Sequence, residues 1–504
     1  MFVKLACAAP LGLSCAGVEV EVDINKGQTS LNIVGLTDTS IQEAKDRIHS
    51  AIKNSGYNYP FNFRILINLA PANLHKEGPL YDLAMASGII LAQEKNIPDL
   101  SNILLLGELA LDGSLRRVQG VLPIVLYAKE NGIENIIVPK ENLSEAALIK
   151  DINIFPANNL AEVINHLLKK NFLKTFSQFS STTPAPIGDL FDMSQIKGQE
   201  FAKRALEVAA AGGHNVLFSG PPGSGKTLLA KTLPTILPPL TDVERLEVTK
   251  IYSIAGLLSH GLINHRPFRS PHHTISHVAL VGGGKLPRPG EISLAHRGVL
   301  FLDEFPEFNR ESIEALRQPL EDGSITVARA QRTLKFPARF ILAASLNPCP
   351  CGYAGDPQKT CACSAAILNK YQKKISGPIL DRIDLHIEVP RLNFEKLTAD
   401  QKSDTSAQIR RRVIVARDIQ QNRFKNSNII SNAEMGNNEI KKFCQLDQAG
   451  LILLRTAVEK MHLSARSYYR LLKIARTIAD LGNQENVDSG HIAEALQFRT
   501  KSYN

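Results

Sequence analysis

The fold of this chain is decided by the stretch Gly220-Pro221-Pro222-Gly223-Ser224-Gly225-Lys226-Thr227. It follows a short apolar run, Asn215–Ser219, and precedes a helical pattern that starts at Leu228. A strand, a glycine-rich turn and a helix in this order predict a phosphate-binding loop, whose backbone N–H groups point inward at the phosphates of ATP. Lys226 would reach the β- and γ-phosphates, and the Thr227 hydroxyl would bind Mg²⁺. The alternative, a Gly/Pro-rich surface turn, leaves the flanking strand and helix unexplained.

The composition is that of a globular protein with an excess of basic residues. Of 504 residues, 44% are hydrophobic and 21% are charged, and the net charge is +9. The length favours about three domains of roughly 150 residues each. A positive balance suits a polyanionic partner such as DNA, although net charge is a weak argument by itself. No run of about 18 uninterrupted apolar residues occurs, so we expect no membrane partner.

The N-terminal residues allow two interpretations. Met1–Gly17 is apolar with Lys4 near its start, which faintly resembles a secretion signal. Val18–Asp23 alternates strictly between apolar and acidic residues, as a half-buried strand does. We therefore expect a β-hairpin of a folded domain over residues 1–24.

Periodicity divides the chain into four parts. Residues 1–170 mix short strand-like runs with helical patterns and predict an α+β domain. Residues 171–190 lose periodicity and fill with Ser, Thr and Pro, which indicates a linker. Residues 191–390 contain the phosphate loop and predict an α/β ATPase core, and residues 391–504 carry the patterns of a helical domain.

Two further predicted strands end in polar side chains. Gly298–Leu302 ends in Asp303 and Glu304, and Phe340–Leu346 ends in Asn347. Because the carboxyl ends of parallel strands share one edge of the sheet, we expect these groups beside the phosphate loop. Asp303 would hold Mg²⁺ through its water shell, Glu304 would orient and polarise the attacking water, and Asn347 would sense the γ-phosphate. A surface Asp-Glu pair is the alternative.

The stretch between Thr227 and Asp303 is long for a minimal fold of this kind. It contains His272, His273 and His277, which could suggest a metal. A polar loop inserted into a helix is the interpretation that we favour.

A β-hairpin is predicted after the carboxylates. Ser324–Phe336 alternates on both sides of a polar centre, with Arg329 and Arg332 near the tip. Arginines on a projecting hairpin can follow the phosphate backbone of DNA. The alternative is an ordinary solvated tip.

Four of the seven cysteines are clustered as C-x-C…C-x-C: Cys349, Cys351, Cys361 and Cys363. Four thiolates can close a tetrahedral structural Zn²⁺ site, although the spacing within each pair is tighter than the usual C-x₂₋₄-C. An iron–sulfur cluster and unligated thiols are the alternatives. Clustering of this kind favours a metal in a reducing compartment, the cytoplasm, over a disulfide scaffold. The site would pin the loop that leaves Asn347.

With these motifs in place, the central part resembles the AAA+ branch that holds magnesium chelatase subunits and MCM helicases. The whole chain is similar to the ComM/YifB family of Mg-chelatase-like proteins. In that branch the arginine of the Asp381-Arg382-Ile383-Asp384 motif reaches the neighbouring subunit's ATP, so the resemblance implies this role for Arg382; a surface ion pair is the alternative. Leu463–Arg470 resembles the second-sensor helix of a C-terminal lid. It implies that Arg466 contacts the γ-phosphate, with Arg470 as the second candidate.

The N-terminal domain resembles the proteolytic domain of Lon proteases, a ribosomal S5-like α+β fold. The resemblance rests on Gly107–Val118, Ile136–Asn142 and Gly78-Pro79-Leu80. The nucleophile position is Leu80, and the expected lysine partner falls near Leu122. Because a leucine cannot attack a carbonyl or take a proton, we expect an inactive relative that serves ring assembly or DNA contact.

The family resemblance implies a hexameric ring, a homo-oligomer that couples ATP hydrolysis to DNA translocation or branch migration. It further implies helicase-type work on single-stranded, forked or branched DNA, in recombination of incoming DNA during natural transformation. Two alternatives belong to other classes. One is a chelatase-type motor that remodels a protein partner; the other is an ATP-dependent protease, which Leu80 argues against.

Overall fold

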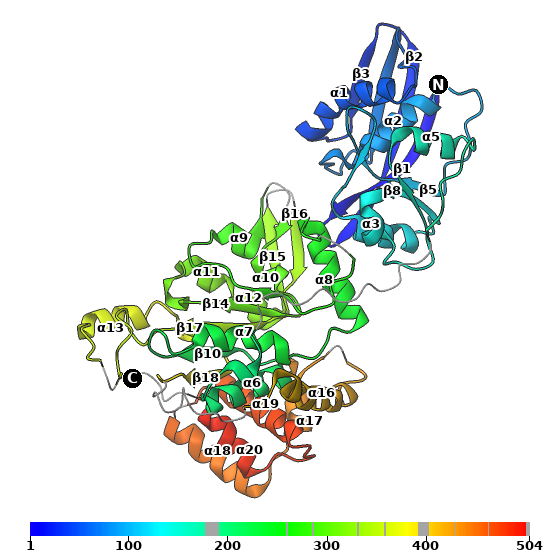
Figure 1. Cartoon of the computed structure of the whole chain (residues 1–504). Coiled ribbons are helices and arrows are strands. Elements are labelled where there is room, and N and C mark those ends of the chain that lie inside the picture. Colours follow the sequence, from blue (N-terminus) through cyan, green and yellow to red (C-terminus); the bar gives the residue numbers. More distant parts are fainter. Residues whose placement is uncertain are drawn as a thin grey trace. The chain divides into compact units, whose positions relative to one another are not determined.

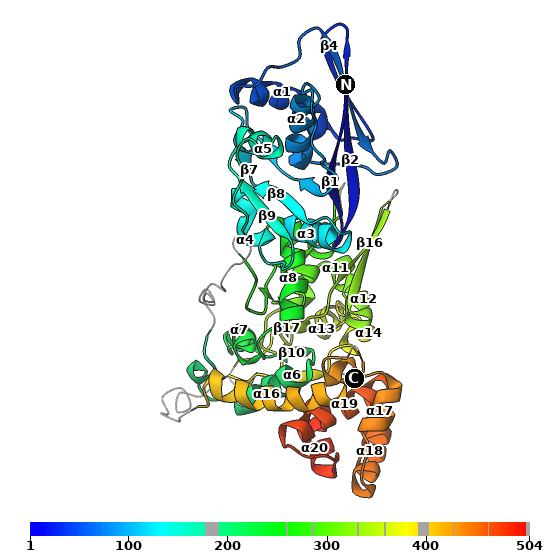
Figure 2. The ribbon, with the colours of Figure 1, turned by 90° about the vertical axis from the view of Figure 1, so that its right-hand side faces the viewer.

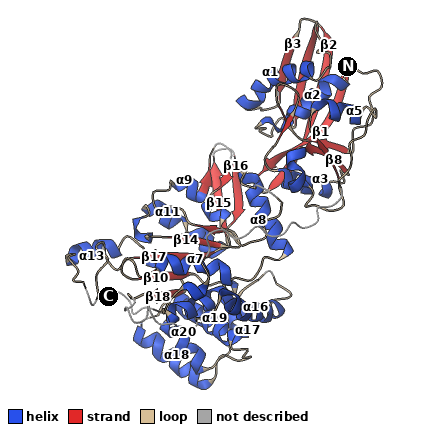
Figure 3. Cartoon of the chain, viewed as in Figure 1, coloured by secondary structure: helices blue, strands red, loops and turns tan. Residues whose placement is uncertain are grey.

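The computed structural model describes residues 1–176, 191–258, 261–284, 287–329, 332–356, 359–391, 403–427, 429–461 and 463–499. The chain forms two compact units (Figure 1), and each combines helices with strands (Figure 3). One unit consists of Met1–Pro184 and Arg245–Ile263; the other consists of Ala185–Glu244 and Asn264–Asn504. The predicted linker 171–190 lies outside the described residues from position 177 onward. The segment Arg245–Ile263, which the sequence analysis placed inside the ATPase core, is grouped with the first unit.

The first unit is built on a seven-stranded mixed sheet in the order β3-β4-β2-β1-β5-β8-β9. The predicted N-terminal hairpin is present, with Phe2 opposite Asp23 and Leu11 opposite Ser14. The strands are β1 (Phe2–Leu11), β2 (Ser14–Lys26), β3 (Ser30–Val34), β4 (Phe63–Ala70), β5 (Ile103–Leu105), β8 (Asn135–Pro139) and β9 (Asn153–Ala157), with a small separate hairpin of β6 (Glu108–Leu109) and β7 (Leu115–Arg116). The helices are α1 (Thr39–Asn54), α2 (Asp82–Leu91), α3 (Val121–Glu130), α4 (Leu143–Ala146) and α5 (Leu160–Leu167).

Leucines occupy the positions at which the resemblance to Lon proteases would place the nucleophile and its lysine partner. Leu80 is 7% exposed and Leu122 is fully buried, and both belong to the hydrophobic core. Next to Leu80 begins α2, whose buried Asp82 pairs with Arg47 at 2.9 Å. Burial raises the pKa of Asp82 to about 6, and Arg47 opposes that rise. The protease positions therefore serve packing in this fold.

The helix α8 (Asp242–Ala255) carries the inserted segment. Near its end Ser253 donates a hydrogen bond of 2.5 Å to the buried carboxylate of Glu145, and its carbonyl accepts one of 3.2 Å from the N–H of Gly120. Since both partners lie in the first unit, these bonds fix the end of α8 to that unit.

The second unit has a five-stranded sheet in the order β11-β14-β17-β10-β18, and every adjacent pair is parallel. Val216 is opposite both Ala343 and Leu385, so the central strands are aligned almost without offset. All five strands therefore begin at one edge and end at the other. Their bounds are β10 (Val216–Ser219), β11 (Phe268–Arg269), β14 (Val299–Leu302), β17 (Ile341–Leu346) and β18 (Leu385–Glu388).

Helices and two hairpins complete the core of this unit. The predicted hairpin is present, with Arg329 paired to Arg332, although residues 330–331 and the two arginine side chains lie outside the description. The hairpins are β12 (Gly282–Gly283) with β13 (Arg288–Pro289), and β15 (Ser324–Arg329) with β16 (Arg332–Pro337). The helices are α6 (Glu200–Gly212), α7 (Lys226–Ile236), α9 (His277–Val281), α10 (Glu291–Leu294), α11 (Arg310–Ala315), α12 (Arg317–Asp322), α13 (Ala365–Gln372) and α14 (Gly377–Leu380).

The C-terminal part of the second unit is helical, as the sequence predicts. It consists of α16 (Ser406–Arg423), α17 (Asn437–Phe443), α18 (Gln448–Met461), α19 (Ala465–Leu481) and α20 (Ser489–Gln497). Helices α16 and α19 both pack on α6 (Figure 2), which fastens these helices to the sheet. Inside them the buried carboxylate of Asp480 binds Arg423 at 2.5 Å and Arg476 at 2.9 Å. None of the helices among the described residues is long and apolar enough to cross a membrane.

Candidate nucleotide-binding site

The phosphate loop leaves β10 and enters α7 at Lys226. Gly225 caps the helix in the left-handed region, with φ of 94°, which side chains rarely adopt. The Lys226 ammonium is turned into the loop: its Nζ donates to the carbonyls of Gly220 at 2.8 Å and Pro221 at 2.9 Å, and to Oδ1 of Asn347 at 3.2 Å. Burial lowers the pKa of Lys226, while Asp303 and Glu304 oppose that fall. The predicted loop, lysine and sensor residue thus lie together.

A hydroxyl and a carboxylate meet beside the lysine. Thr227 Oγ1 donates to Oδ2 of Asp303 at 2.9 Å. The other oxygen of Asp303 accepts hydrogen bonds from the Ser345 hydroxyl and, at 3.1 Å, from the N–H of Glu304. Oxygen ligands of this kind are those that Mg²⁺ prefers, so the donor set fits the magnesium that a bound ATP brings.

Ser345 is the residue of this group that the sequence analysis missed. Its hydroxyl binds Asp303, and it also accepts the N–H of Glu304 at 3.2 Å. A signal was available: Ser345 lies near the end of β17, two residues before Asn347, and the period of two in a strand predicts that their side chains share a face. It is the polar residue of that strand and links the ends of β14 and β17.

Glu304 has a left-handed backbone, with φ of 51° and ψ of 47°, directly after the strand. Its side chain is 55% exposed and points toward Nδ1 of His273 at 3.5 Å, so the two form an ion pair when the histidine is protonated. His272 packs against His273 with ring centroids 4.1 Å apart, and His277 begins α9. The described residues contain no metal-binding cluster of histidines. The inserted loop therefore delivers His273 to the predicted catalytic carboxylate.

Arg382 and Arg466 lie away from the phosphate loop of their own chain. Arg382 lies three residues before β18, at the edge where the parallel strands begin, whereas the loop follows the end of β10. Its guanidinium binds the carboxylate of Glu321 and the carbonyl of Pro378 at 2.5 Å. Arg466, at the start of α19, binds the same Glu321 carboxylate at 3.0 Å. The structure thus brings the two predicted arginines together on one carboxylate that the sequence analysis did not single out.

Arg470, the second candidate for the sensor, is bound to Asp384 at 2.6 Å. Burial raises the pKa of the Asp384 carboxyl, but Arg470 and then His214 outweigh it and hold that pKa well below its usual range. Arg470 therefore serves an internal ion pair at the edge where the strands begin.

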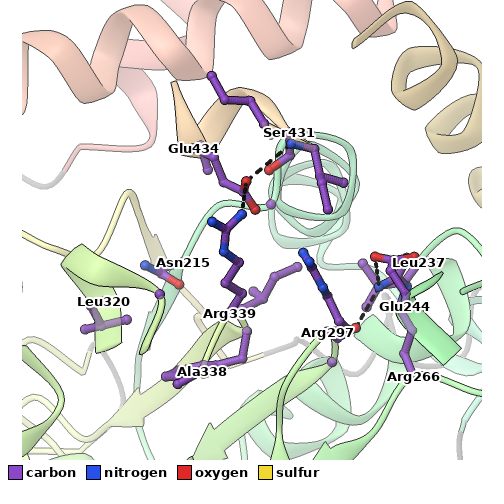
Figure 4. A pocket seen from close by; sticks show the side chains of 18 of the residues that line it. Asn215, Leu237, Glu244, Arg266, Arg297, Leu320, Ala338, Arg339, Ser431 and Glu434 are labelled. Carbon is purple, nitrogen blue, oxygen red and sulfur yellow. Dashed lines mark hydrogen bonds and ion pairs between the residues drawn. The ribbon is translucent and has the colours of Figure 1, made fainter. Parts of the chain in front are cut away.

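A cavity of about 360 Å³ opens at this edge (Figure 4). Six cationic side chains and five carboxylates line it. Arg339 reaches Glu434 at 2.8 Å and Arg266 reaches Glu244 at 3.2 Å (Figure 4). With Arg470 on Asp384, three of the six cations have an acidic partner among the described ion pairs. Burial lowers the pKa of Arg417 to about 10, and the neighbouring Arg266 adds to that fall. This network joins the C-terminal helices to the sheet and is a structural one.

The four clustered cysteines lie as a zinc site requires. Their sulfur atoms all lie within 4.8 Å of one another. Cys349 is 3.2 Å from Cys351 and 3.7 Å from Cys361, and Cys351 is 3.6 Å from Cys361. Zinc–sulfur bonds of about 2.3 Å in a tetrahedron place the sulfurs about 3.8 Å apart, so the cluster fits Zn²⁺ with little adjustment.

The cysteine loop rests directly on the phosphate loop. Gly352, between the two cysteine pairs, has φ of 83°. A Cβ atom there would lie 2.5 Å from Cδ and 2.6 Å from Cγ of Pro222. Since only glycine allows this approach, the two loops depend on each other for their positions.

We predict that Gly352→Ala weakens ATP binding at least several-fold. The added methyl must displace Pro222, and the left-handed backbone costs a further ~1–2 kcal/mol. The measurement is the Kd of a fluorescent ATP analogue. Gly355→Ala is the matched control, because Gly355 in the same loop has φ of 77° and open space around its Cα. Equal losses in the two variants would show that the contact with Pro222 is irrelevant.

Comparisons with known proteins agree with this architecture. Three family descriptions match in turn: subunit ChlI of Mg-chelatase over residues 20–142, magnesium chelatase subunit ChlI over 192–397, and the C-terminal part of that subunit over 403–499.

Full-length relatives cover nearly the whole chain. Competence protein ComM of Haemophilus influenzae is 43% identical over 501 residues, which cover 97% of this chain and 96% of that protein. YifB of Escherichia coli is 42% identical over 495 residues with the same coverage. Lon protease 2 of Bacillus subtilis is 30% identical over 180 residues, 32% of each chain. The chain belongs to the ComM/YifB family of magnesium-chelatase-like AAA+ proteins.

Proposed function

We propose that this protein is a hexameric, ring-forming ATPase of the cytoplasm that couples ATP hydrolysis to DNA translocation or branch migration. The main support for a ring is that the phosphate-binding residues and the two arginines of the predicted site lie at opposite edges of the sheet. The phosphate loop, Asp303 and Asn347 lie where the strands end, whereas Arg382 and Arg466 lie where they begin. One chain cannot bring both halves to one nucleotide, but two neighbouring copies can.

Within one copy, each residue of the loop edge has a role that its position supports. Residues Gly220–Thr227 and the Lys226 ammonium would hold the phosphates, and Thr227 with Asp303 would hold Mg²⁺, which neutralises phosphate charge when bound. Glu304 would orient the attacking water, with Ser345 fixing its backbone and His273 beside its carboxylate. Asn347 would report the state of the γ-phosphate to the cysteine loop that follows it.

The neighbouring copy would supply Arg382 as charge builds on the γ-phosphoryl oxygens. A cation delivered in trans is worth a factor of about 10³–10⁵ in turnover. Because Arg466 shares the Glu321 carboxylate with Arg382, we propose that it acts on the same neighbouring nucleotide. This replaces the expectation that Arg466 reaches the γ-phosphate of its own chain.

Three observations support DNA as the substrate: the positive net charge, the arginines of the β15–β16 hairpin and the similarity to a competence protein. The net charge is +9, and Arg329 and Arg332 are the last paired residues before the tip of the β15–β16 hairpin. The relative in Haemophilus influenzae is named a competence protein. We therefore propose single-stranded, forked or branched DNA as the partner, in recombination of incoming DNA during natural transformation. The first unit would serve ring assembly or DNA contact.

A second candidate is a chelatase-type motor that remodels a protein partner. It is favoured by the magnesium chelatase descriptions that match three parts of the chain.

We propose that Cys349, Cys351, Cys361 and Cys363 hold a structural Zn²⁺. Elemental analysis of the purified protein should find about one zinc per chain, since one tetrahedral site takes one ion. Cys351→Ser should lower the zinc content, whereas Cys444→Ser, at a buried cysteine outside the cluster, should leave it unchanged. Iron in place of zinc would favour an iron–sulfur cluster, and a metal-free protein would leave four thiols.

Mixing two inactive variants tests the shared site. Lys226→Ala and Arg382→Ala should each be nearly inactive alone. In rings formed from a 1:1 mixture, about a quarter of the interfaces between neighbouring subunits combine an intact Lys226 from one subunit with an intact Arg382 from the next. About a quarter of wild-type ATP turnover should therefore return. Unmixed Arg382→Ala protein that hydrolyses ATP at the wild-type rate would refute the role in trans.

ATP turnover with and without forked DNA tests the substrate. We expect forked DNA to raise turnover, and the double variant Arg329→Ala/Arg332→Ala to lose much of that stimulation because the phosphate contacts are gone. Arg455→Ala is the matched control, since Arg455 is 83% exposed on α18 and pairs with Glu459. An ATP turnover that DNA leaves unchanged but a partner protein raises would favour the chelatase-type motor.

A further inference from the structure

A second cavity of the sheet unit, of about 690 Å³, is separate from the arginine-lined one. Its floor is the face of the sheet formed by β10 and β18, where Leu217 is paired with His386. Helices α13 and α14 and the segment between α18 and α19 supply further walls. The apolar part of the lining includes Leu217, Leu346, Tyr371, Leu380, Met461 and Leu463. This size and character are those of sites that bind drug-sized molecules.

One cation in this cavity has two side-chain nitrogens without a hydrogen-bond partner. Two nitrogens of Arg499, Nε and Nη2, are buried and make no hydrogen bond to any described residue. Burial lowers the pKa of Arg499, as expected for a guanidinium removed from water, while Asp384 opposes that fall. Buried polar groups are rarely left unpaired in native proteins, so these N–H groups call for an acceptor.

The position of Arg499 is fixed by its neighbours in sequence. The carbonyl of Phe498 accepts the N–H of His386 at 2.8 Å, which attaches the chain after α20 to β18. The Phe498 ring is fully buried and stacks on Phe201 with centroids 5.1 Å apart. The backbone at Arg499 is therefore held in place before any ligand arrives, which lowers part of the entropy cost of binding.

The other titratable groups of the lining do not cancel this charge at contact distance. Burial, and next the nearby Arg499, lower the pKa of His386 to about 4, so it is neutral at pH 7. Lys373 adds a second cation and Asp381 a single carboxylate. No ion pair between Arg499 and an acid is found among the described residues. The lining thus presents one buried cationic group beside an extended apolar surface.

We propose that this cavity binds a small organic anion, with the charged group on the Arg499 guanidinium and an apolar or aromatic body against the strands and the C-terminal helices. It borders the nucleotide site at Asn347, but no residue of the phosphate loop Gly220–Thr227 lines it. The ligand class follows from the lining. An anionic group would accept hydrogen bonds from the Arg499 N–H groups, and an apolar body would pack against the leucines and Tyr371.

The probe is 8-anilinonaphthalene-1-sulfonate, which joins a sulfonate to an aromatic body. It is titrated by fluorescence against the full chain without nucleotide. We expect saturable binding, and Arg499→Leu should raise the Kd about tenfold or more because a charge-assisted hydrogen bond is lost. Gln372→Glu, an exposed position on the rim, should raise the Kd about threefold by adding a like charge. Arg455→Leu, outside the cavity, should leave it unchanged.

The outcomes separate the alternatives. Thermal unfolding of each variant identifies any loss of fold, and Gln372→Glu carries the test if Arg499→Leu does not fold. Equal affinities in all variants, or no saturable binding, would overturn the proposal. Much tighter binding by a variant that ends at Arg499 would overturn it too, because the residues after Arg499 would then be the occupant. None of these measurements involves ATP hydrolysis, so their failure leaves the proposed ATPase untouched.

Discussion

The parallel alignment of five strands is the constraint on which the chemistry of this protein depends. Parallel strands collect their ends at one edge of the sheet, and this edge holds the phosphate loop with Asp303 and Asn347. The same alignment places Arg382 at the opposite edge, because it lies three residues before the start of β18. If Arg382 acts on a nucleotide as we propose, that nucleotide belongs to a neighbouring copy, and the proposed ring follows from this geometry.

Short polar contacts hold the loop edge together. Asp303 accepts hydrogen bonds from a helix residue, from Ser345 on the next strand and from the backbone that follows it. Because Gly352 has no side chain, the cysteine loop can pack closely against Pro222. The proposed zinc site would therefore stabilise the position of the phosphate loop as well as its own.

The first unit packs apolar side chains where the resemblance to Lon proteases would place catalytic ones. The nucleophile position of that resemblance is Leu80 and its lysine position falls near Leu122, and both leucines lie in the hydrophobic core. The unit also takes in Arg245–Ile263 from the middle of the chain, through bonds to Ser253. Packing at these two positions agrees with the proposed role in assembly or DNA contact.

The local features of this protein could be predicted from the amino-acid sequence. Three motifs can be recognised because their residues are neighbours in the chain. They are the glycine-rich turn between a strand and a helix, the carboxylates after an apolar run, and the paired cysteines. The packing of the fold is what joins Arg382 and Arg466 through Glu321, brings His273 to Glu304, and leaves two buried nitrogens of Arg499 unpaired beside a cavity. These contacts join residues far apart in sequence, and periodicity carries no information about which distant side chains the packing of the sheet brings together.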